Sequence, residues 1–271
     1  MKQVQFFVMA IAVFMGISFS SCLSSNEDPI TPTRVAWATV ESSDYLDMDY
    51  FFRLDSGEKL IPTAGISNAV LTGVKRVFIT YTYDNIDEFD AQNLISDPAK
   101  REYHVSITYA LNLEDERNVT NLTAHDTTNP GDSLTTKYYA PITSIDTLWI
   151  KDNYLSAWVN YDMSGNKMHF LTLFRYRNDA LRLGENDAPD TLDVYLGHNG
   201  NGDTYYDTTS KNLANTDMRY VPLYFKAFNI ASVMYNVAED IAPSNLVLNV
   251  ITRQVLNSRD TINVSYPVKY N

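Results

Sequence analysis

The stretch Val74–Tyr83 reads VKRVFITYTY and decides the fold class. Val77, Ile79 and Tyr81 fall on one side of an extended chain, because successive side chains of a strand point to opposite faces. The stretch Tyr103–Leu113 (YHVSITYALNL) has the same period of two. These two alternating stretches predict long strands of a sheet that has one buried face.

Short alternating stretches continue through the rest of the chain, separated by polar turns. Asp55-Ser56-Gly57 predicts a tight turn, because glycine adopts a positive φ readily. We predict a helical turn within residues 85–100, a long loop at residues 114–136 and a short helix at residues 228–235. Many short strands with polar turns are typical of sandwiches and barrels, so we predict an all-β protein. Further strands are predicted at residues 34–40, 48–54, 58–62, 146–150, 154–161, 167–177, 191–196, 220–225, 245–251 and 261–270.

An apolar leader precedes this body. Lys2 is the only charged residue before Glu27, and Val4–Ser20 (VQFFVMAIAVFMGISFS) is almost wholly apolar or small. A basic start, an apolar middle and small residues at the end predict a secretory signal. The alternative is an uncleaved membrane anchor, for which the run is slightly short of the roughly 20 residues that span a bilayer.

The leader ends at Cys22, the only cysteine in the chain. A lone cysteine after small residues resembles a bacterial lipoprotein signal, although Phe19 stands where that pattern favours leucine. The resemblance implies cleavage after residue 21 and lipidation of Cys22, which anchors the protein in a membrane because each buried methylene contributes about 0.8 kcal/mol.

Residues 23–28 (LSSNED) place a short acidic patch directly after this cysteine. Such a patch resembles the surface-export signal of Bacteroidetes lipoproteins, and its alternative is an ordinary solvated tether. We therefore expect a lipid-anchored outer-membrane protein that faces the cell surface. Residues 22–33 have too few apolar side chains to pack and predict an extended tether.

The charge balance excludes two classes of partner. The chain has 21 basic and 33 acidic residues and a formal net charge of −12. Nucleic acid requires a basic footprint, and so does lying flat on an anionic membrane. The single cysteine also excludes an intrachain disulfide, so burial of the 45% hydrophobic residues must stabilise the core.

Three segments carry a resemblance to a known family. They are Arg34–Val40 (RVAWATV), then Leu148-Trp149-Ile150 followed by Tyr154-Leu155 and the hairpin to His169, and then Leu192–Asn199 (LDVYLGHN). Together with the leader they resemble the NigD-like lipoproteins of Bacteroidetes. The resemblance implies an N-terminal OB-like barrel in residues 34–140, including a boundary loop, and a C-terminal immunoglobulin-like β-sandwich in residues 141–271. The family name reflects a proposed link to bacteriocin immunity, and no functional residues transfer with it.

No motif in the chain predicts catalysis or a cofactor. His104, His125, His169 and His198 lie outside any HExxH context, and one cysteine cannot build a thiolate metal site. We interpret the histidines as ordinary strand or loop residues and the acidic clusters as solvated loops. GxSxG, P-loop and GxGxxG motifs are also missing from the sequence.

One segment has the spacing of a cation site. Asn199, Asn201 and Asp203 place oxygen ligands at alternate positions, which resembles the start of a calcium loop. Thr204 stands where such a loop has glycine, and Ser210 stands where it has glutamate. A glycine-rich hairpin turn is the alternative interpretation.

A recurring triplet predicts a modification. Six times, Asp precedes Ser or Thr and then an apolar residue or Thr, which resembles the O-glycosylation motif of Bacteroidetes exported proteins. The alternative is that this pair is favourable turn chemistry where strands begin. The implied glycan sites are Thr127, Ser133, Thr147, Thr191, Thr208 and Thr261.

These features favour a cell-envelope lipoprotein that binds an unknown protein or glycan partner without catalysis, with an immunity-like role as one subclass. A fimbrial component is one alternative, and its mark is a detachable terminal strand at residues 261–270. A glycan-binding accessory is the other, and its mark is a set of exposed coplanar rings among the 13% aromatic residues.

Overall fold

The computed structural model describes residues 32–42, 50–66, 71–114, 119–122, 138, 140–161, 169–176, 179, 181–185, 188–201, 225–231, 233–234, 237, 246–255 and 261–270. The prediction of an all-β protein is confirmed, because the described elements are strands apart from one α-helix and one 3-10 helix. The chain divides into two compact units. The first comprises residues up to Ala36, Glu41–Val70 and Ile79–Ala110; the second comprises Trp37–Val40, Leu71–Phe78 and Leu111–Asn271.

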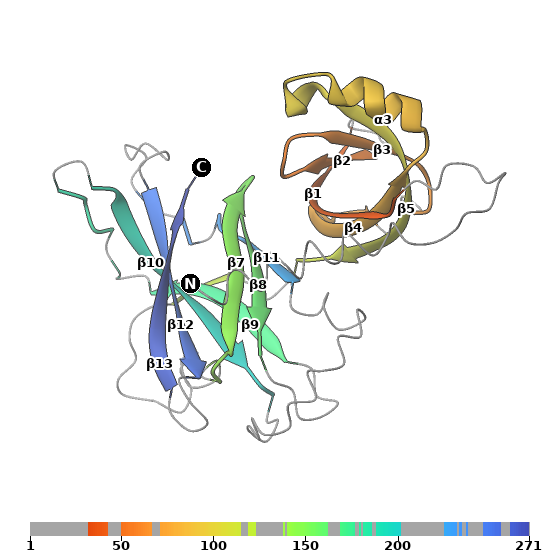
Figure 1. The fold of residues 1–271 in the computed structure, drawn as a ribbon. Coiled ribbons are helices and arrows are strands. Elements are labelled where there is room, and N and C mark those ends of the chain that lie inside the picture. Colours follow the sequence, from red (N-terminus) through yellow and green to blue (C-terminus); the bar gives the residue numbers. More distant parts are fainter. Residues whose placement is uncertain are drawn as a thin grey trace, which may run out of the picture. The chain divides into compact units, whose positions relative to one another are not determined.

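Five strands form a closed barrel in the order β1-β2-β3-β5-β4 (Figure 1). β2 and β3 are antiparallel, whereas β3 and β5 are parallel. The predicted turn at Gly57 is confirmed, with a φ of 109°. The strands are β1 (Arg34–Ser42), β2 (Tyr50–Leu54), β3 (Lys59–Ala64), β4 (Arg76–Tyr83) and β5 (Glu102–Asn112).

The predicted helical turn between β4 and β5 is a helix of two turns. α3 (Ile86–Asn93) begins at Asn85, whose side chain accepts the N–H groups of Asp87 and Glu88. This is the arrangement that satisfies the free donors at a helix start. A 3-10 turn, η2 (Pro98–Lys100), follows.

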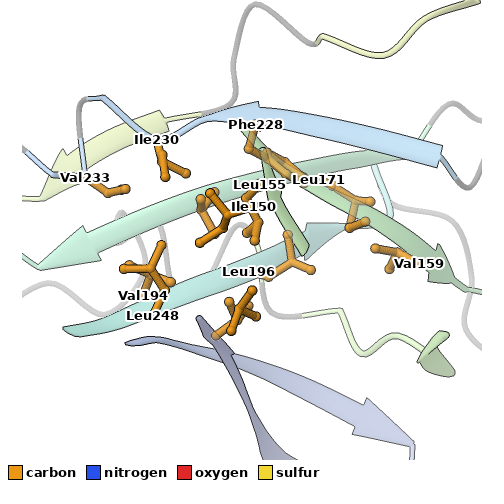
Figure 2. Close-up of a cluster of buried hydrophobic side chains, with 14 of the residues drawn as sticks. Ile150, Leu155, Val159, Leu171, Val194, Leu196, Phe228, Ile230, Val233 and Leu248 are labelled. Atoms are coloured by element: carbon orange, nitrogen blue, oxygen red, sulfur yellow. The ribbon is translucent and has the colours of Figure 1, made fainter. Parts of the chain in front are cut away.

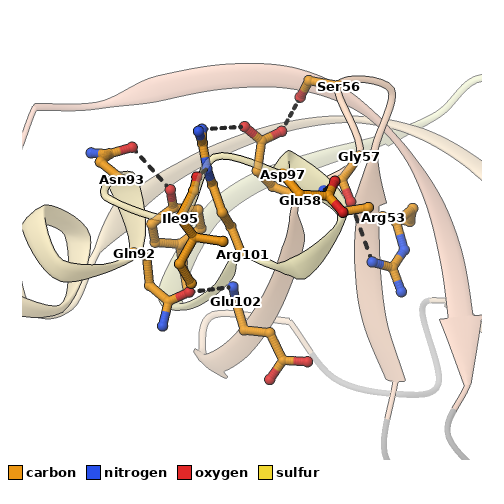
Figure 3. Close-up of polar contacts among 12 residues, drawn as sticks. Arg53, Ser56, Gly57, Glu58, Gln92, Asn93, Ile95, Asp97, Arg101 and Glu102 are labelled. Atoms are coloured by element: carbon orange, nitrogen blue, oxygen red, sulfur yellow. Dashed lines mark hydrogen bonds and ion pairs between the residues drawn. The ribbon is translucent and has the colours of Figure 1, made fainter.

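Polar contacts tie the segment after α3 to the β2–β3 turn (Figure 3). Arg101 lies 3.5 Å from the Glu58 carboxylate, and both side chains are largely buried. Arg101 also donates to the carbonyl of Ile95, and Gln92 accepts the backbone N–H of Glu102 at 3.0 Å. These contacts fix the connection from β4 to β5 against the barrel.

Two sheets form the second part of the fold. The five-stranded sheet has the order β13-β12-β10-β9-β6, and the three-stranded sheet has the order β11-β8-β7. β10 pairs in parallel with β12, and β6 pairs in parallel with β9. The strands are β6 (Val119–Leu122), β7 (Ser144–Lys151), β8 (Tyr154–Asn160), β9 (Phe170–Tyr176), β10 (Asp190–Asn199), β11 (Phe225–Asn229), β12 (Leu246–Val255) and β13 (Thr261–Lys269).

Apolar side chains from the two sheets meet in one core (Figure 2). Leu155 and Val159 come from the three-stranded sheet, and Leu171, Val194 and Leu248 come from the five-stranded sheet, with 2% exposure or less at each. Burying such a side chain contributes about 1.5–3 kcal/mol. The alternating pattern places these side chains on the core face of each sheet, and β8 and β9 are buried on both faces.

A buried arginine organises a polar network inside the second unit. Arg76 is 0% exposed. Its Nη1 donates to Thr39 Oγ1 at 3.1 Å, and its Nη2 donates to Ser156 Oγ at 3.0 Å. Thr39 in turn donates to Asp152 Oδ2 at 3.0 Å. The guanidinium is thus linked through a hydroxyl to a carboxylate, which offsets part of the cost of burying its charge.

The structure corrects two sequence predictions. The polar stretch 114–136, predicted to be a loop, contains β6, because pairing with β9 stabilises a strand that lacks an alternating pattern of its own. The helix predicted at residues 228–235 is wrong at its start, since Phe228 and Asn229 lie in β11 and pair with Leu155 and Tyr154. A cross-strand partner determines the backbone there, not local propensity.

Candidate functional site

Two histidines far apart in sequence form a buried pair in the second unit. β9 and β10 are antiparallel, with Leu171 opposite His198 and Phe170 opposite Asn199. This register brings His169 Nδ1 to 3.0 Å from His198 Nε2. His198 is 1% exposed and His169 is 9% exposed. The pair is a closed polar contact inside an otherwise apolar region.

The hydrogen bonds define the protonation of this pair. His198 Nδ1 lies 3.0 Å from the Pro141 carbonyl, which can only accept, so Nδ1 carries a proton. Neutral His198 therefore accepts at Nε2 from His169 Nδ1. The pKa of His198 is lowered to about 4, mainly by burial. The bond to the Pro141 carbonyl raises this pKa, and the nearby His169 lowers it by a smaller amount.

A short segment pairs with His198. We call Tyr138, Ala140, Pro141 and Ile142 the strap. The Ala140 N–H donates to the His198 carbonyl at 2.9 Å, and the His198 N–H donates to the Tyr138 carbonyl at 3.2 Å. His198 therefore holds the strap by both its main chain and its ring.

All three tryptophans of the chain lie in one aromatic cluster of the second unit. The ring centroids of Trp37 and Trp149 are 4.5 Å apart, with an angle of 83° between the ring planes. Those of Trp158 and Phe225 are 5.0 Å apart, with an interplanar angle of 82°. Phe78 completes the cluster, 4.7 Å from Phe225. Edge-to-face contacts are typical of packed rings. They differ from the coplanar platform that a glycan-binding accessory predicts.

The other two histidines of the chain are His104 and His125, and the described residues form no cluster of metal ligands. His104 is half exposed, with Nδ1 2.8 Å from Glu88 Oε1 on the barrel, and His125 lies outside the described residues. Within the described ranges, no three His, Cys, Asp or Glu side chains gather as metal ligands would. The helices of the same ranges lack the length and apolar composition needed to cross a membrane.

The predicted calcium segment is described only in part. Asn199 ends β10, and its Oδ1 accepts the N–H of Asn201 at 2.8 Å. Asn201 has a φ of 52°, as turn residues do. Asp203 lies outside the described residues, as does Cys22.

Three of the six predicted glycan sites lie on described strands. Thr147 is exposed on β7, Thr191 is half-buried on β10, and Thr261 begins β13. The aspartates before the first two make local contacts: Asp146 accepts from Ser144 at 3.0 Å, and Asp190 accepts from the Gly184 N–H at 2.9 Å. These contacts fit the turn interpretation. The other sites, Thr127, Ser133 and Thr208, lie outside the described residues.

If the triplets are glycosylation sites, protein from its native cells will be heavier than its lipidated polypeptide. Exposed Thr147 is the test position, because a bulky polar glycan needs a solvent-facing side chain. We expect Thr147→Val to remove one glycan mass in intact-mass measurement. Asp146→Asn is the matched change to the triplet and should have the same effect. A native mass equal to that of the lipidated polypeptide leaves only the turn chemistry.

Comparison with known proteins gives structural relatives. No family model matches the chain, and no curated protein matches it. An uncharacterised protein from Parabacteroides merdae has a TM-score of 0.50 at 12% identity, with coverage of 87% of this chain and 96% of that one. At this identity the comparison shows the fold alone.

Two further solved structures have names that bear on the predicted resemblance. A NigD-like immunity protein from Bacteroides caccae is 16% identical, with a TM-score of 0.48 and coverage of 85% of this chain and 91% of that one. A protein with a NigD-like name is thus among the solved structures to which this chain is similar. A putative toxin-related protein from Parabacteroides distasonis is 17% identical, with a TM-score of 0.46 and coverage of 87% and 93%.

Sequence reasoning assigned His169 and His198 to ordinary strand or loop positions and missed their contact. The residues are 29 positions apart. Nothing in either local sequence indicates the partner, because the contact depends on the register between β9 and β10. The glycine before His198 is the one available signal. A Cβ at Gly197 would lie 2.7 Å from Tyr138 Cβ, so the strap requires glycine there.

Proposed function

We propose that this protein is a lipid-anchored protein of the cell envelope that binds a partner without catalysis, in an immunity-like role. The observation that carries the proposal is the leader that ends in Ser20-Ser21 before the chain's single cysteine. Lipid on Cys22, followed by a polar tether, holds a folded β body at a membrane surface. The proposed position of that body is the outside of the outer membrane.

The names of the two solved structures support the immunity-like part of the proposal. One is called a NigD-like immunity protein, and the other is called a putative toxin-related protein. An immunity protein binds its toxin rather than transforming it. For this chain we propose the same kind of action, interception of a protein toxin at the membrane where the lipid holds the β body.

Replacing Cys22 with alanine tests the anchor. Without the thiol no lipid is attached, so the protein should move from the membrane fraction to the soluble fraction or keep its leader. The measurement is fractionation of native cells, with labelled palmitate incorporation and the mature N-terminus as further readouts. Ser21→Ala is the matched control, because it keeps a small residue before the cysteine. A Cys22→Ala protein that is still processed and still membrane-bound contradicts the anchor.

The same variants test the immunity-like role. A strain without the gene is challenged with culture supernatants of competing bacteria, and its killing is compared with that of strains that carry the wild-type gene or the Ser21→Ala gene. Protection by these two genes and loss of protection with Cys22→Ala is the expected result. If the strain without the gene survives every killing supernatant as well as the strains that carry the gene, the immunity-like role is contradicted. This result does not affect the proposed lipid anchor.

The alternatives have weaker structural support. A fimbrial component needs a detachable last strand, but β13 pairs with β12 from Val255–Thr261 to Val247–Lys269, and Val268 is buried in the sandwich core. A glycan-binding accessory needs exposed stacked rings. The stacked pair of Phe174 and Tyr195 has Phe174 only 4% exposed.

We also infer that the barrel is OB-like and that the sandwich is immunoglobulin-like in its two-layer build. Five strands in a closed barrel whose third strand pairs with its fifth support the first inference. Two facing sheets around one core support the second. The parallel pairs β10–β12 and β6–β9 depart from the antiparallel sheets of an immunoglobulin domain.

A further inference from the structure

We propose that His198, together with His169, is an acid-released clasp that holds the strap on β10. This inference does not depend on the anchor or on the immunity-like role. It concerns what the second unit does when the surrounding pH falls. It rests on the contacts of the strap and on the two hydrogen bonds of the His198 ring.

The strap pairs with two strands of the five-stranded sheet, β10 and β12. Ala140 and Tyr138 bond to the main chain of His198 on β10, and the Ile142 N–H donates to the Arg253 carbonyl on β12 at 2.9 Å. Tyr138 lies so close to β10 that any side chain at Gly197 would displace it. The strap therefore packs tightly against β10 while the His198 ring keeps its hydrogen bond to the Pro141 carbonyl.

Protonation breaks this arrangement at one atom. In the neutral pair, His198 Nε2 accepts from His169 Nδ1 across 3.0 Å. A proton on His198 Nε2 converts the acceptor into a donor that faces the Nδ1–H of His169, so the bond is lost unless His169 moves its own proton to Nε2. The charged ring then needs water, which its 1% exposure denies. The strap contacts the ring through the Pro141 carbonyl. Tyr138 and Ala140 are only half-buried, whereas Ile142 is 0% exposed in the sandwich core, so release concerns the Tyr138 and Ala140 end of the strap.

The groups around His198 favour this response. Among the described residues, Tyr161 after β8 and His169 before β9 bring titratable side chains against the His198 ring. Tyr138 of the strap bonds to His198 through its carbonyl. Tyr161 lies 4.7 Å from the His198 ring and 5.4 Å from the His169 ring. Arg253 on β12 contacts the strap through its carbonyl. The nearby His169 also lowers the pKa of His198.

The direction of the pH dependence follows from the lowered pKa. In the closed state the pKa of His198 is about 4, whereas the hydrated ring of the open state has the ordinary pKa of 6.5. The open state therefore binds the proton more tightly. The closed clasp is most stable above pH 6.5 and loses stability as the pH falls from 6.5 toward 4. By this linkage the opening equilibrium should increase about 30-fold between pH 7.5 and pH 5.

Hydrogen exchange of the full chain measures the opening. The reporter is the amide of Ala140, and the reference is the set of β8 amides, with each rate expressed as a protection factor. In the wild type, the protection of the Ala140 amide should fall about 30-fold from pH 7.5 to pH 5, while that of β8 changes little. Equal changes in the strap and β8 overturn the proposal.

Three variants isolate the clasp. His198→Asn keeps an amide donor for Pro141 but takes no proton, so strap protection should no longer depend on pH. Gly197→Ala displaces Tyr138 and should give low strap protection already at pH 7.5, which calibrates the open state. His169→Gln offers a carbonyl to protonated His198 and should weaken the acid response severalfold.

These variants keep the test decisive. Acid release that persists unchanged in His198→Asn overturns the proposal. If His198→Asn does not fold, the wild type and His169→Gln decide the question, because a His169→Gln protein with the full wild-type acid response also overturns it.

Discussion

Replacing Arg76 with alanine is expected to lower the free energy of unfolding of the second unit by about 3–5 kcal/mol. The guanidinium is fully buried and donates to two hydroxyls, those of Thr39 and Ser156. A hydrogen bond to a charged group contributes about 1.5–3 kcal/mol, and the cavity left by the side chain adds to the loss. Urea unfolding followed by tryptophan fluorescence measures the effect, because all three tryptophans lie in this unit.

Two further variants show whether the burial and the forked shape of Arg76 cause this loss of unfolding free energy. Arg182→Ala removes an arginine whose side chain is 58% exposed, although it makes two bonds to Asp193 at 2.6 and 2.7 Å. A surface ion pair contributes at most about 1 kcal/mol, so this loss should be small. Arg76→Lys keeps the charge but lacks the forked guanidinium that reaches both hydroxyls. Its loss of unfolding free energy should lie between those of Arg76→Ala and Arg182→Ala. A loss below about 1 kcal/mol for Arg76→Ala contradicts the role given to this network.

The strands of the barrel were predictable from local pattern. Val77, Ile79 and Tyr81 alternate in the sequence, and all three are buried in β4. The pattern is informative because each such strand has one face in the core and one outside. It is less reliable at Tyr109, which follows the same period in β5 and is 43% exposed. Alternation indicates a strand there but not how far the buried face extends.

The pairing of the strands was not predictable, and neither was the site. The parallel contacts of β3 with β5 and of β10 with β12 join segments that are distant in sequence. No local pattern encodes such partners, since any strand with one apolar face fits several neighbours. The contact between His169 and His198 follows from the register of β9 and β10, so it was hidden for the same reason. The resemblance of the Cys22 region to a lipoprotein signal differs from these contacts, because neighbouring residues in the sequence carry it.

Replacing Phe228 with alanine is expected to lower the free energy of unfolding by about 3–5 kcal/mol. The ring is 0% exposed and packs in the sandwich core with Leu155 and Leu171 (Figure 2). Removing a large buried ring costs its transfer free energy and leaves a cavity that the neighbouring strands fill only in part. Urea unfolding measures the loss, and Ile262→Ala on β13 is the exposed control, at 42% exposure, with an expected change within about 0.5 kcal/mol.

Phe225 separates this effect from a general weakness of β11. The two phenylalanines lie three positions apart on one strand, so their rings point to opposite faces of the sheet. Phe225 contacts Trp37 at 4.8 Å and Trp158 at 5.0 Å, whereas Phe228 belongs to the core between the sheets. Phe225→Ala should therefore change the tryptophan emission of the native protein, and Phe228→Ala should destabilise the protein while leaving that emission unchanged. The same change in native emission for both variants contradicts the placement of the two rings on opposite faces.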